Sequence, residues 1–251
     1  MSLVKKRLRK PIKMKLDSTP ARVADLAEFK DRHKGKVGFV LGAGYSLNNI
    51  NAERLCASGV TFVCNMAIRA VPHCDYYMYT DGGPPYFAYF SKVRHVARNI
   101  CHCCRGLPGG FANLKCSGKK YTVDRKYEGR DNCEFDYNKL IFGLNIGHVM
   151  AHFAWVCGCN PIVLIGMDCN YKGGRKYAVA YDELERPIFQ GWNYKGDNLG
   201  NSDGHLGASI NLWRKIARVN PNSRIVNASE GVLDCFPRVN IANYYVPVEE
   251  V

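Results

Sequence analysis

The segment from residue 143 to residue 177 constrains the fold most, because it joins a long apolar run to a short one across a proline. The long run, His148 to Asn160, is rich in Val, Ala, Phe and Trp and predicts a helix buried on most sides, which Pro161 should end. The short run, Pro161 to Gly166, predicts a parallel strand buried on both faces. Ligands of open α/β sheets bind beyond the carboxyl ends of strands, so we expect the chemistry near Gly166-Met167-Asp168.

Four further runs also read as strands, and each is followed by polar or turn-forming residues. The runs are Lys36 to Leu41, Val60 to Cys64, Asp75 to Tyr79 and Arg224 to Asn227, and the residues beyond them are Gly42 to Ser46, Asn65, Asp81 and Ala228 to Gly231. Any one of these residues could be only a helix cap or a turn former. Their recurrence at the same end of strands predicts a single crevice. The expected fold is α/β, with a mostly parallel sheet and helices on both faces.

The remaining segments predict one domain with an arm and two insertions. Helices are expected over residues 19 to 34, 51 to 57, 86 to 98 and 206 to 219. Residues 1–18 read as a basic flexible arm and residues 19–251 as a single domain. Within that domain, residues 105–138 and 169–204 lack clear periodicity and are predicted to be loop or lid-like insertions over the crevice.

Charge narrows the class of partner. The formal net charge of +13 favours phosphates, nucleotides, nucleic acid or an anionic membrane face. Residues 1 to 16 carry seven basic side chains and no acidic one, so they form either a solvated arm or an electrostatic tether to a polyanion. No run of 18 apolar residues is present, so no transmembrane helix is expected.

Twelve cysteines are scattered through the predicted helices and strands, and no apolar signal-peptide core precedes them. This pattern favours reduced thiols and a cytoplasmic location over a disulfide framework. The basic residues add the expectation of a position at the periphery of a polyanionic surface. The cluster Cys101-His102-Cys103-Cys104, with Cys116 and Cys133, offers zinc ligands, but its spacing does not match a C-x-x-C pair of knuckles.

Three histidines invite opposite interpretations. His148 and His152 lie four residues apart on the apolar helix, a metal-binding spacing, yet they lack the glutamate of the zinc-protease motif and are predicted to be core residues. His205 precedes the apolar pattern of its helix. A helix N-terminus disfavours the protonated imidazole, so a neutral His205 could accept a proton from a substrate hydroxyl, or it could simply be a capping or surface residue.

The turn Gly42-Ala43-Gly44-Tyr45-Ser46 follows a buried strand directly. Its glycines allow backbone N–H groups to approach a phosphate or ribose closely. The turn lacks the third glycine of the dinucleotide fingerprint, which weighs against hydride transfer. A purely structural turn is the alternative.

The order of these motifs resembles that of the bacterial sialyltransferases that act on lipooligosaccharide. It also resembles a related group that contains archaeal 6-hydroxymethyl-dihydropterin pyrophosphokinase and the flagellar motility accessory factors. The resemblance covers residues 36 to 236 and rests on KVGFVLGAGYSLNNI with FVCN, PHCDYYMYTDG, NIGHVMAHFAWVCGCNPIVLIGMDCNYKGGRKYA, and GHLGASINLWRKI followed by IVNASEGV. It implies a Rossmann-like fold, a variant of the glycosyltransferase-A type.

The resemblance also implies roles for residues. Donor or nucleotide contacts fall on Gly42, Ala43, Gly44, Ser46, Asn65, Asp81, Asn145, Ile146, Gly147, Gly166 and Asp168. Tyr171 and Tyr177 would contact the departing phosphate, and His205 would be the general base. Asp168 is expected to organise its loop rather than to catalyse.

Two positions depart from the sialyltransferase pattern. Ala43 replaces an asparagine that contacts the donor, which weakens the prediction that the donor nucleotide is a cytidine nucleotide. Asp81 matches the pterin-kinase and motility-factor group instead, and a carboxylate facing a diphosphate normally requires a divalent cation, so Mg²⁺ at Asp81 is an open expectation.

Three functions remain open from the sequence. The leading one is a transferase with a nucleotide-activated donor, a CMP-sugar or similar, that moves a sugar to a hydroxyl of a glycan or other acceptor. The first alternative is a Mg²⁺-dependent 6-hydroxymethylpterin-type pyrophosphokinase that uses ATP. The second is a nucleic-acid-binding or structural protein that keeps the fold without catalysis.

Overall fold

A computed structural model describes residues 20–80, 93, 96–103, 116, 118–125, 132–170 and 204–247, without the side chains of residues 66 and 204–206. The predicted basic arm lies outside these residues. Most of the two predicted insertions, including Tyr171 and Tyr177, also lies outside them, and so does Asp81.

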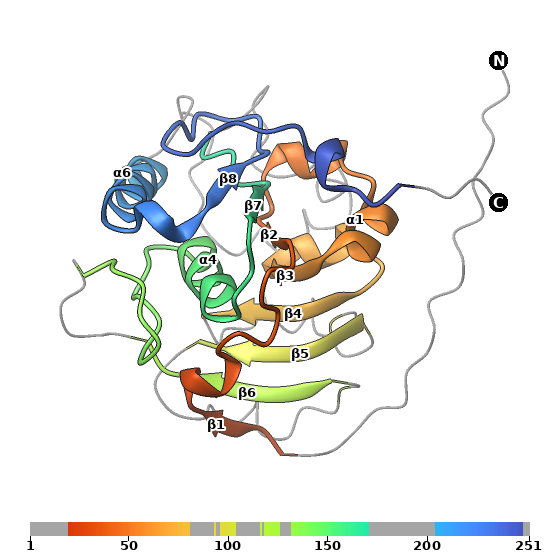
Figure 1. Cartoon of the computed structure of the whole chain (residues 1–251), viewed down its shortest axis with the longest axis vertical. Helices are drawn as coiled ribbons and strands as arrows, with labels where there is room; N and C mark the ends of the chain where they lie inside the picture. Colours follow the sequence, from red (N-terminus) through yellow and green to blue (C-terminus); the bar gives the residue numbers. More distant parts are fainter. Residues whose placement is uncertain are drawn as a thin grey trace, which may run out of the picture.

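The described strands form one sheet in which every neighbouring pair is parallel (Figure 1). The strand order is β1-β6-β5-β4-β3-β2-β7-β8. The strands are β1 (Arg22–Ala24), β2 (Gly38–Leu41), β3 (Val60–Cys64), β4 (Cys74–Tyr79), β5 (Ala97–His102), β6 (Lys119–Val123), β7 (Ile162–Ile165) and β8 (Ile225–Asn227). The prediction of a Rossmann-like α/β fold is confirmed.

The strand order reverses beside β2. From β2 the chain builds outward through β3, β4, β5 and β6, and it then returns to place β7 and β8 on the other side of β2. Such a reversal leaves a crevice at the carboxyl ends of the two strands that flank it, because their connections leave in opposite directions. A ligand site is therefore expected beyond the ends of β2 and β7.

Helical segments cover both faces of the sheet. They are α1 (Ala52–Ser58), α4 (Ile146–Val156), α6 (Gly204–Val219) and the 3₁₀ segments η1 (Leu26–Phe29), η2 (Tyr45–Asn49), η3 (Asn65–Ala70), η5 (Pro221–Ser223) and η6 (Ile241–Tyr244). Side chains from η1, α4 and α6 share one core with alternate residues of the strands, such as Val40 and Phe62. Those of η2, α1 and η3 share the other core with Phe39 and Val63.

Helix α4 is the central element of the first face and is buried except for Trp155. Asn145 caps its N-terminus by accepting the N–H of His148. The helix ends at Val156, earlier than predicted, because Gly158 adopts φ +77° and ends the helix in a left-handed turn. Pro161 therefore follows a turn and not the helix itself.

The segment before β2 corrects the predicted helix over residues 19 to 34. Residues Arg22–Ala24 form β1, which pairs in parallel with β6. Asp25 and Glu28 then form a capping box on the short η1, and Asp31 leaves the helical region with φ +57°. Pairing with a strand a hundred residues away overrides local helix preference, and no local pattern could indicate it.

Strands β5 and β6 were also missed. Ala97–His102 begins inside the helix predicted over residues 86 to 98, of which only Val93 and Val96 are otherwise described. Lys119–Val123 lies inside the predicted insertion. Lys120 is only 4% exposed, and burial of a lysine is the kind of event that a hydropathy pattern misses.

Across the described residues the cysteines are free, and no three His, Cys, Asp or Glu side chains gather to form a metal site. Cys101, Cys103, Cys116 and Cys133 of the suggested zinc cluster are all buried, and Cys104 lies outside the described residues. Burial raises the pKa of the Cys101 thiol well above its usual range. None of the described helices combines the length and apolarity needed to cross a lipid bilayer.

Candidate functional site

The ends of β2 and β7 meet at a contact that only glycine allows. Beyond the strands, the amide of Gly42 donates to Ile165 O and that of Gly44 to Gly166 O, both at 2.8 Å. A Cβ on Gly42 would lie 2.5 Å from Gly166 O, and one on Gly44 would lie 2.2 Å from Asp168 Oδ2. The two glycines of the turn are thus required for this backbone approach, whatever the turn binds.

Asp168 joins three strand ends. Its carboxylate is 3% exposed. Oδ2 accepts the N–H of Ser46 at 2.9 Å, and Oδ1 accepts those of Glu230 and Gly231 at 3.1 and 3.2 Å. With both oxygens engaged by backbone donors, Asp168 holds the loops after β2, β7 and β8 together. We call these loops, residues 42–46, 166–168 and 229–231, the corner.

Two serines complete the corner from opposite sides. Ser46 Oγ accepts the amide of Gly166 at 3.2 Å, and Ser229 Oγ accepts that of Met167 at 2.9 Å. The guanidinium of Arg238 donates to the carbonyls of Ser229 and Gly231. Sequence reasoning missed Arg238, since an arginine in an irregular tail gives no local signal of a long-range role.

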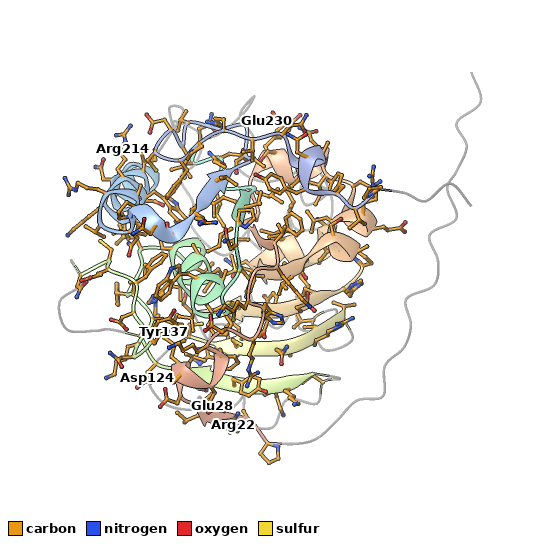
Figure 2. All side chains as sticks on the ribbon, in the orientation of Figure 1. Arg22, Glu28, Asp124, Tyr137, Arg214 and Glu230 are labelled. Atoms are coloured by element: carbon orange, nitrogen blue, oxygen red, sulfur yellow. The ribbon has the colours of Figure 1, made fainter. Side chains whose placement is uncertain are left out.

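Glu230 lies at the exposed edge of the corner and receives a hydrogen bond from the Asn49 side chain. Figure 2 places Glu230 at the end of the molecule that carries β8, and the exposed Arg22–Glu28 pair at the opposite end beside β1. The corner and the far edge of the sheet are therefore separate regions.

The corner extends to the first turn of α4 through Met167. A Cβ on Gly42 or on Gly147 would lie 2.8 Å from Met167 Sδ, so this side chain fills the space between the glycine turn and the helix N-terminus. The predicted donor segment Asn145-Ile146-Gly147 is consequently adjacent to the glycine turn. A helix N-terminus presents free N–H groups and a positive partial charge, which favour an anion.

On the other side of β2, Asn65 follows β3. The register pairs Leu41 with Val63, so Ala43 and Asn65 come equally far beyond the paired strands. Asn65 adopts φ +44°, a region that asparagine tolerates better than most residues. Among the described residues, neither its side chain nor the amide of Ala43 finds a hydrogen-bond partner. We call these two groups the Asn65 side.

The turn therefore offers a ligand fewer amides than expected. The amides of Gly42, Gly44 and Ser46 are bonded to Ile165 O, Gly166 O and Asp168 Oδ2, and the Ala43 amide, which has no partner among the described residues, is available to a ligand. Asp81, expected beside Asn65 at the next strand end, lies outside the described residues.

The first turns of α6 lie against the N-terminus of α4. Helix α6 begins at Gly204, so the backbone of His205 is in its first turn, as predicted. One turn later, Ser209 Oγ accepts a hydrogen bond from Asn145 Nδ2 at 2.6 Å. The side chain of His205, like Tyr171 and Tyr177, is outside the described part of the chain.

His148 and His152 are core residues, as the sequence predicted. His148 accepts the amide of Asn145 at Nδ1 and bonds Ser209 O through Nε2 at 3.2 Å. His152 accepts the amide of Ile141 at Nδ1 and bonds Asp136 O through Nε2 at 2.8 Å. Both rings are fully buried, and in each one Nδ1 accepts a backbone amide, as a neutral imidazole does.

Cys169 follows Asp168 with φ +55°. Burial raises the pKa of its thiol to about 12, and the charge of Asp168 adds to the increase. The raised pKa favours the protonated thiol at neutral pH, which is the opposite of the lowered pKa of catalytic thiolates.

No protein-family model matches the sequence, and no curated protein matches it either. Among solved structures, the MAf glycosyltransferase from Magnetospirillum magneticum AMB-1 is similar, with a TM-score of 0.56 and 15% identity over 90% of this chain. The chain spans 38% of the length of that protein.

Two sialyltransferases are more distant. The alpha-2,3-sialyltransferase from Campylobacter jejuni gives a TM-score of 0.44 at 15% identity, over 82% of this chain and 81% of that one. The sialyltransferase CST-II, solved with a trisaccharide acceptor and CMP, gives 0.45 at 14% identity, over 81% and 86%.

Proposed function

We propose that this chain is a transferase with a nucleotide-activated donor, and more specifically a sialyltransferase-like glycosyltransferase that moves a sugar to a hydroxyl acceptor. One observation carries the proposal. Two polar groups beyond β2 and β3, the Ala43 amide and the Asn65 side chain, have no partner in the described chain. They lie near the glycine turn after β2, which contacts the N-terminus of α4 through Met167. The fold shared with the MAf glycosyltransferase is consistent with this function.

The proposed roles follow from charge. The donor phosphate would lie near the first turn of α4 and the Ala43 amide, where N–H groups compensate its charge. Asn65 would hydrogen-bond the base or ribose. Tyr171 and Tyr177 would donate to the phosphate oxygen on which charge grows as the bond to the anomeric carbon breaks. The acceptor oxygen would form the new bond to that carbon while its proton passes to His205.

The described residues do not fit a magnesium site. Both oxygens of Asp168 accept backbone N–H groups, and no acidic cluster occurs among the described residues. The roles proposed above therefore use protein groups alone. The pyrophosphokinase alternative depends on Asp81 for its cation and becomes an outcome of the test.

The test is a thermal-shift panel of CMP, CDP, UDP, GDP and ATP, each with and without Mg²⁺. Nucleotide at about a hundred times its Kd should stabilise the fold by roughly 2.7 kcal/mol, a shift of several degrees. Stabilisation by CMP without metal is the expected result. A thermal shift with ATP only when Mg²⁺ is present would favour the pyrophosphokinase instead. No shift with any nucleotide would reject both the glycosyltransferase and the pyrophosphokinase.

Turnover of a CMP-sugar then tests the base. We expect His205→Ala to lower kcat by about 10²- to 10⁴-fold while CMP still binds, because only proton transfer is lost. His73→Ala is the matched control, since His73 precedes β4 at the opposite end of the strands. Equal loss in both variants would contradict the role of His205.

A further inference from the structure

Ser209 is fully buried at the contact between α6 and α4. Its Oγ accepts the Asn145 side-chain amide at 2.6 Å and lies 3.5 Å from Nε2 of His148, which also bonds the Ser209 carbonyl. A hydrogen bond from Ser209 to the Cys169 thiol partly opposes the increase in the pKa of that thiol. One hydroxyl therefore contacts the start of α4, its first turn and the loop after β7.

These contacts form a closed ring. Asn145 Oδ1 caps α4 through the amide of His148, its Nδ2 bonds Ser209, and its own amide donates to Nδ1 of His148. Nε2 of His148 bonds the carbonyl of Ser209, which closes the ring. A buried ring of this kind has few alternative arrangements, because a shift of α6 by one residue would leave several polar groups without partners.

The ring sets the register of α6 near its N-terminus. His205 precedes Ser209 by four residues, about one helical turn or ~6 Å along the axis. A general base loses much of its effect when it is displaced by about 1 Å. The position of Ser209 against Asn145 thus determines where the turn that carries His205 lies relative to the start of α4.

We propose that Ser209 is a positioning residue that fixes His205 relative to the donor site at the N-terminus of α4. The role of His205 as a base rests on the proposed function, whereas the position of α6 against α4 does not depend on it. Ser209 itself is not expected to touch substrate, since it is buried beneath the helix contact.

The first measurement needs no activity. The imidazole signals of His205, assigned by loss of signal in His205→Ala, are followed by NMR through a pH titration. Ser209→Ala should shift these signals and the pKa of His205, and Ser209→Thr, which keeps the hydroxyl, should retain the wild-type values. Ser223→Ala, a buried serine in η5 beyond the other end of α6, is the control and should change neither.

The second measurement uses turnover. Ser209→Ala should lower kcat about tenfold or more and move the acidic limb of its pH profile, with CMP affinity within about twofold of wild type. Unchanged His205 signals in Ser209→Ala would overturn the inference. Shifted signals in a chain that binds no nucleotide would support the positioning role and reject only the proposed function.

Discussion

The two parts of the candidate site use their polar groups in opposite ways. In the corner, Asp168, Ser46 and Ser229 accept hydrogen bonds from the backbone of neighbouring loops. On the Asn65 side, the side chain of Asn65 and the amide of Ala43 bond to none of the described residues. Both parts consist of polar residues just beyond parallel strands, so their sequences look alike.

The difference separates stability from binding. A buried acceptor that satisfies backbone donors leaves those donors without partners when it is removed, at a cost in folding free energy. A polar group without a partner inside the protein contributes little to folding and can contribute fully to a ligand. We therefore expect substitutions in the corner to lower the free energy of unfolding and substitutions on the Asn65 side to weaken nucleotide binding.

The largest effect is expected at Asp168. Asp168→Ala removes the acceptor of three backbone N–H groups and should lower the free energy of unfolding by about 4 kcal/mol. Urea denaturation measures the change. The exposed Asp234→Ala is the control, because its ion pair with Arg214 lies at the surface and contributes little. A stable Asp168→Ala protein would remove the distinction between the two parts.

Gly231→Ala should come next. A Cβ at this position would lie 1.8 Å from Asp168 O, so the loop after β8 must move away from Asp168. We expect a loss of about 3 kcal/mol in the free energy of unfolding.

Its control is Gly207→Ala. Within the described part of the chain, and apart from its own helix backbone, no atom comes within 4 Å of a Cβ on Gly207, which is in α6. Alanine favours a helix over glycine by roughly 0.8–1 kcal/mol, so this variant should gain a little stability. Paired unfolding curves that show the same sign for both glycines would contradict the close approach at Gly231.

Asn65→Gly tests the other side of the comparison. Glycine accepts φ +44° without strain, so the variant removes only the side chain, and the free energy of unfolding should change by less than about 1 kcal/mol. Nucleotide affinity, measured by calorimetry, should fall about tenfold, or ~1.4 kcal/mol. Unchanged affinity together with a large loss of stability would place Asn65 with the corner.

The smallest effect lies outside both parts. His33 bonds the Tyr76 hydroxyl at 2.9 Å, and burial lowers the pKa of His33 below its ordinary value of 6.5. The unfolded chain therefore binds the proton more readily, and stability should decrease as pH falls below about 6.5, levelling off below the folded pKa. The ring is partly exposed, so the loss should be less than about 1 kcal/mol.

His33→Gln should remove this pH dependence of unfolding and leave that of turnover unchanged. If it also removed the pH dependence of turnover, the assignment of that dependence to His205 would be wrong. The measurement thus separates the effect of His33 protonation on stability from the effect of His205 protonation on turnover.

Much of the sheet was predictable from local pattern. The runs that became β2, β3, β4, β7 and β8 are mostly apolar because both faces of the sheet are covered. The edge half was not predictable. β1 has three residues and β6 begins with two lysines, and each becomes a strand only through its neighbours.

For the site, the sequence determined which residue types follow which strands, and therefore that polar groups gather at the carboxyl ends of the parallel strands. The segment that contains α4, β7 and Asp168 carried this information by itself, since burial, a proline and a glycine restrict a chain locally. Only the tertiary structure decided how each polar group is used. That depends on partners over a hundred residues away in sequence, such as Ser46 for Asp168, and the pairing of distant backbone donors and acceptors leaves no local pattern.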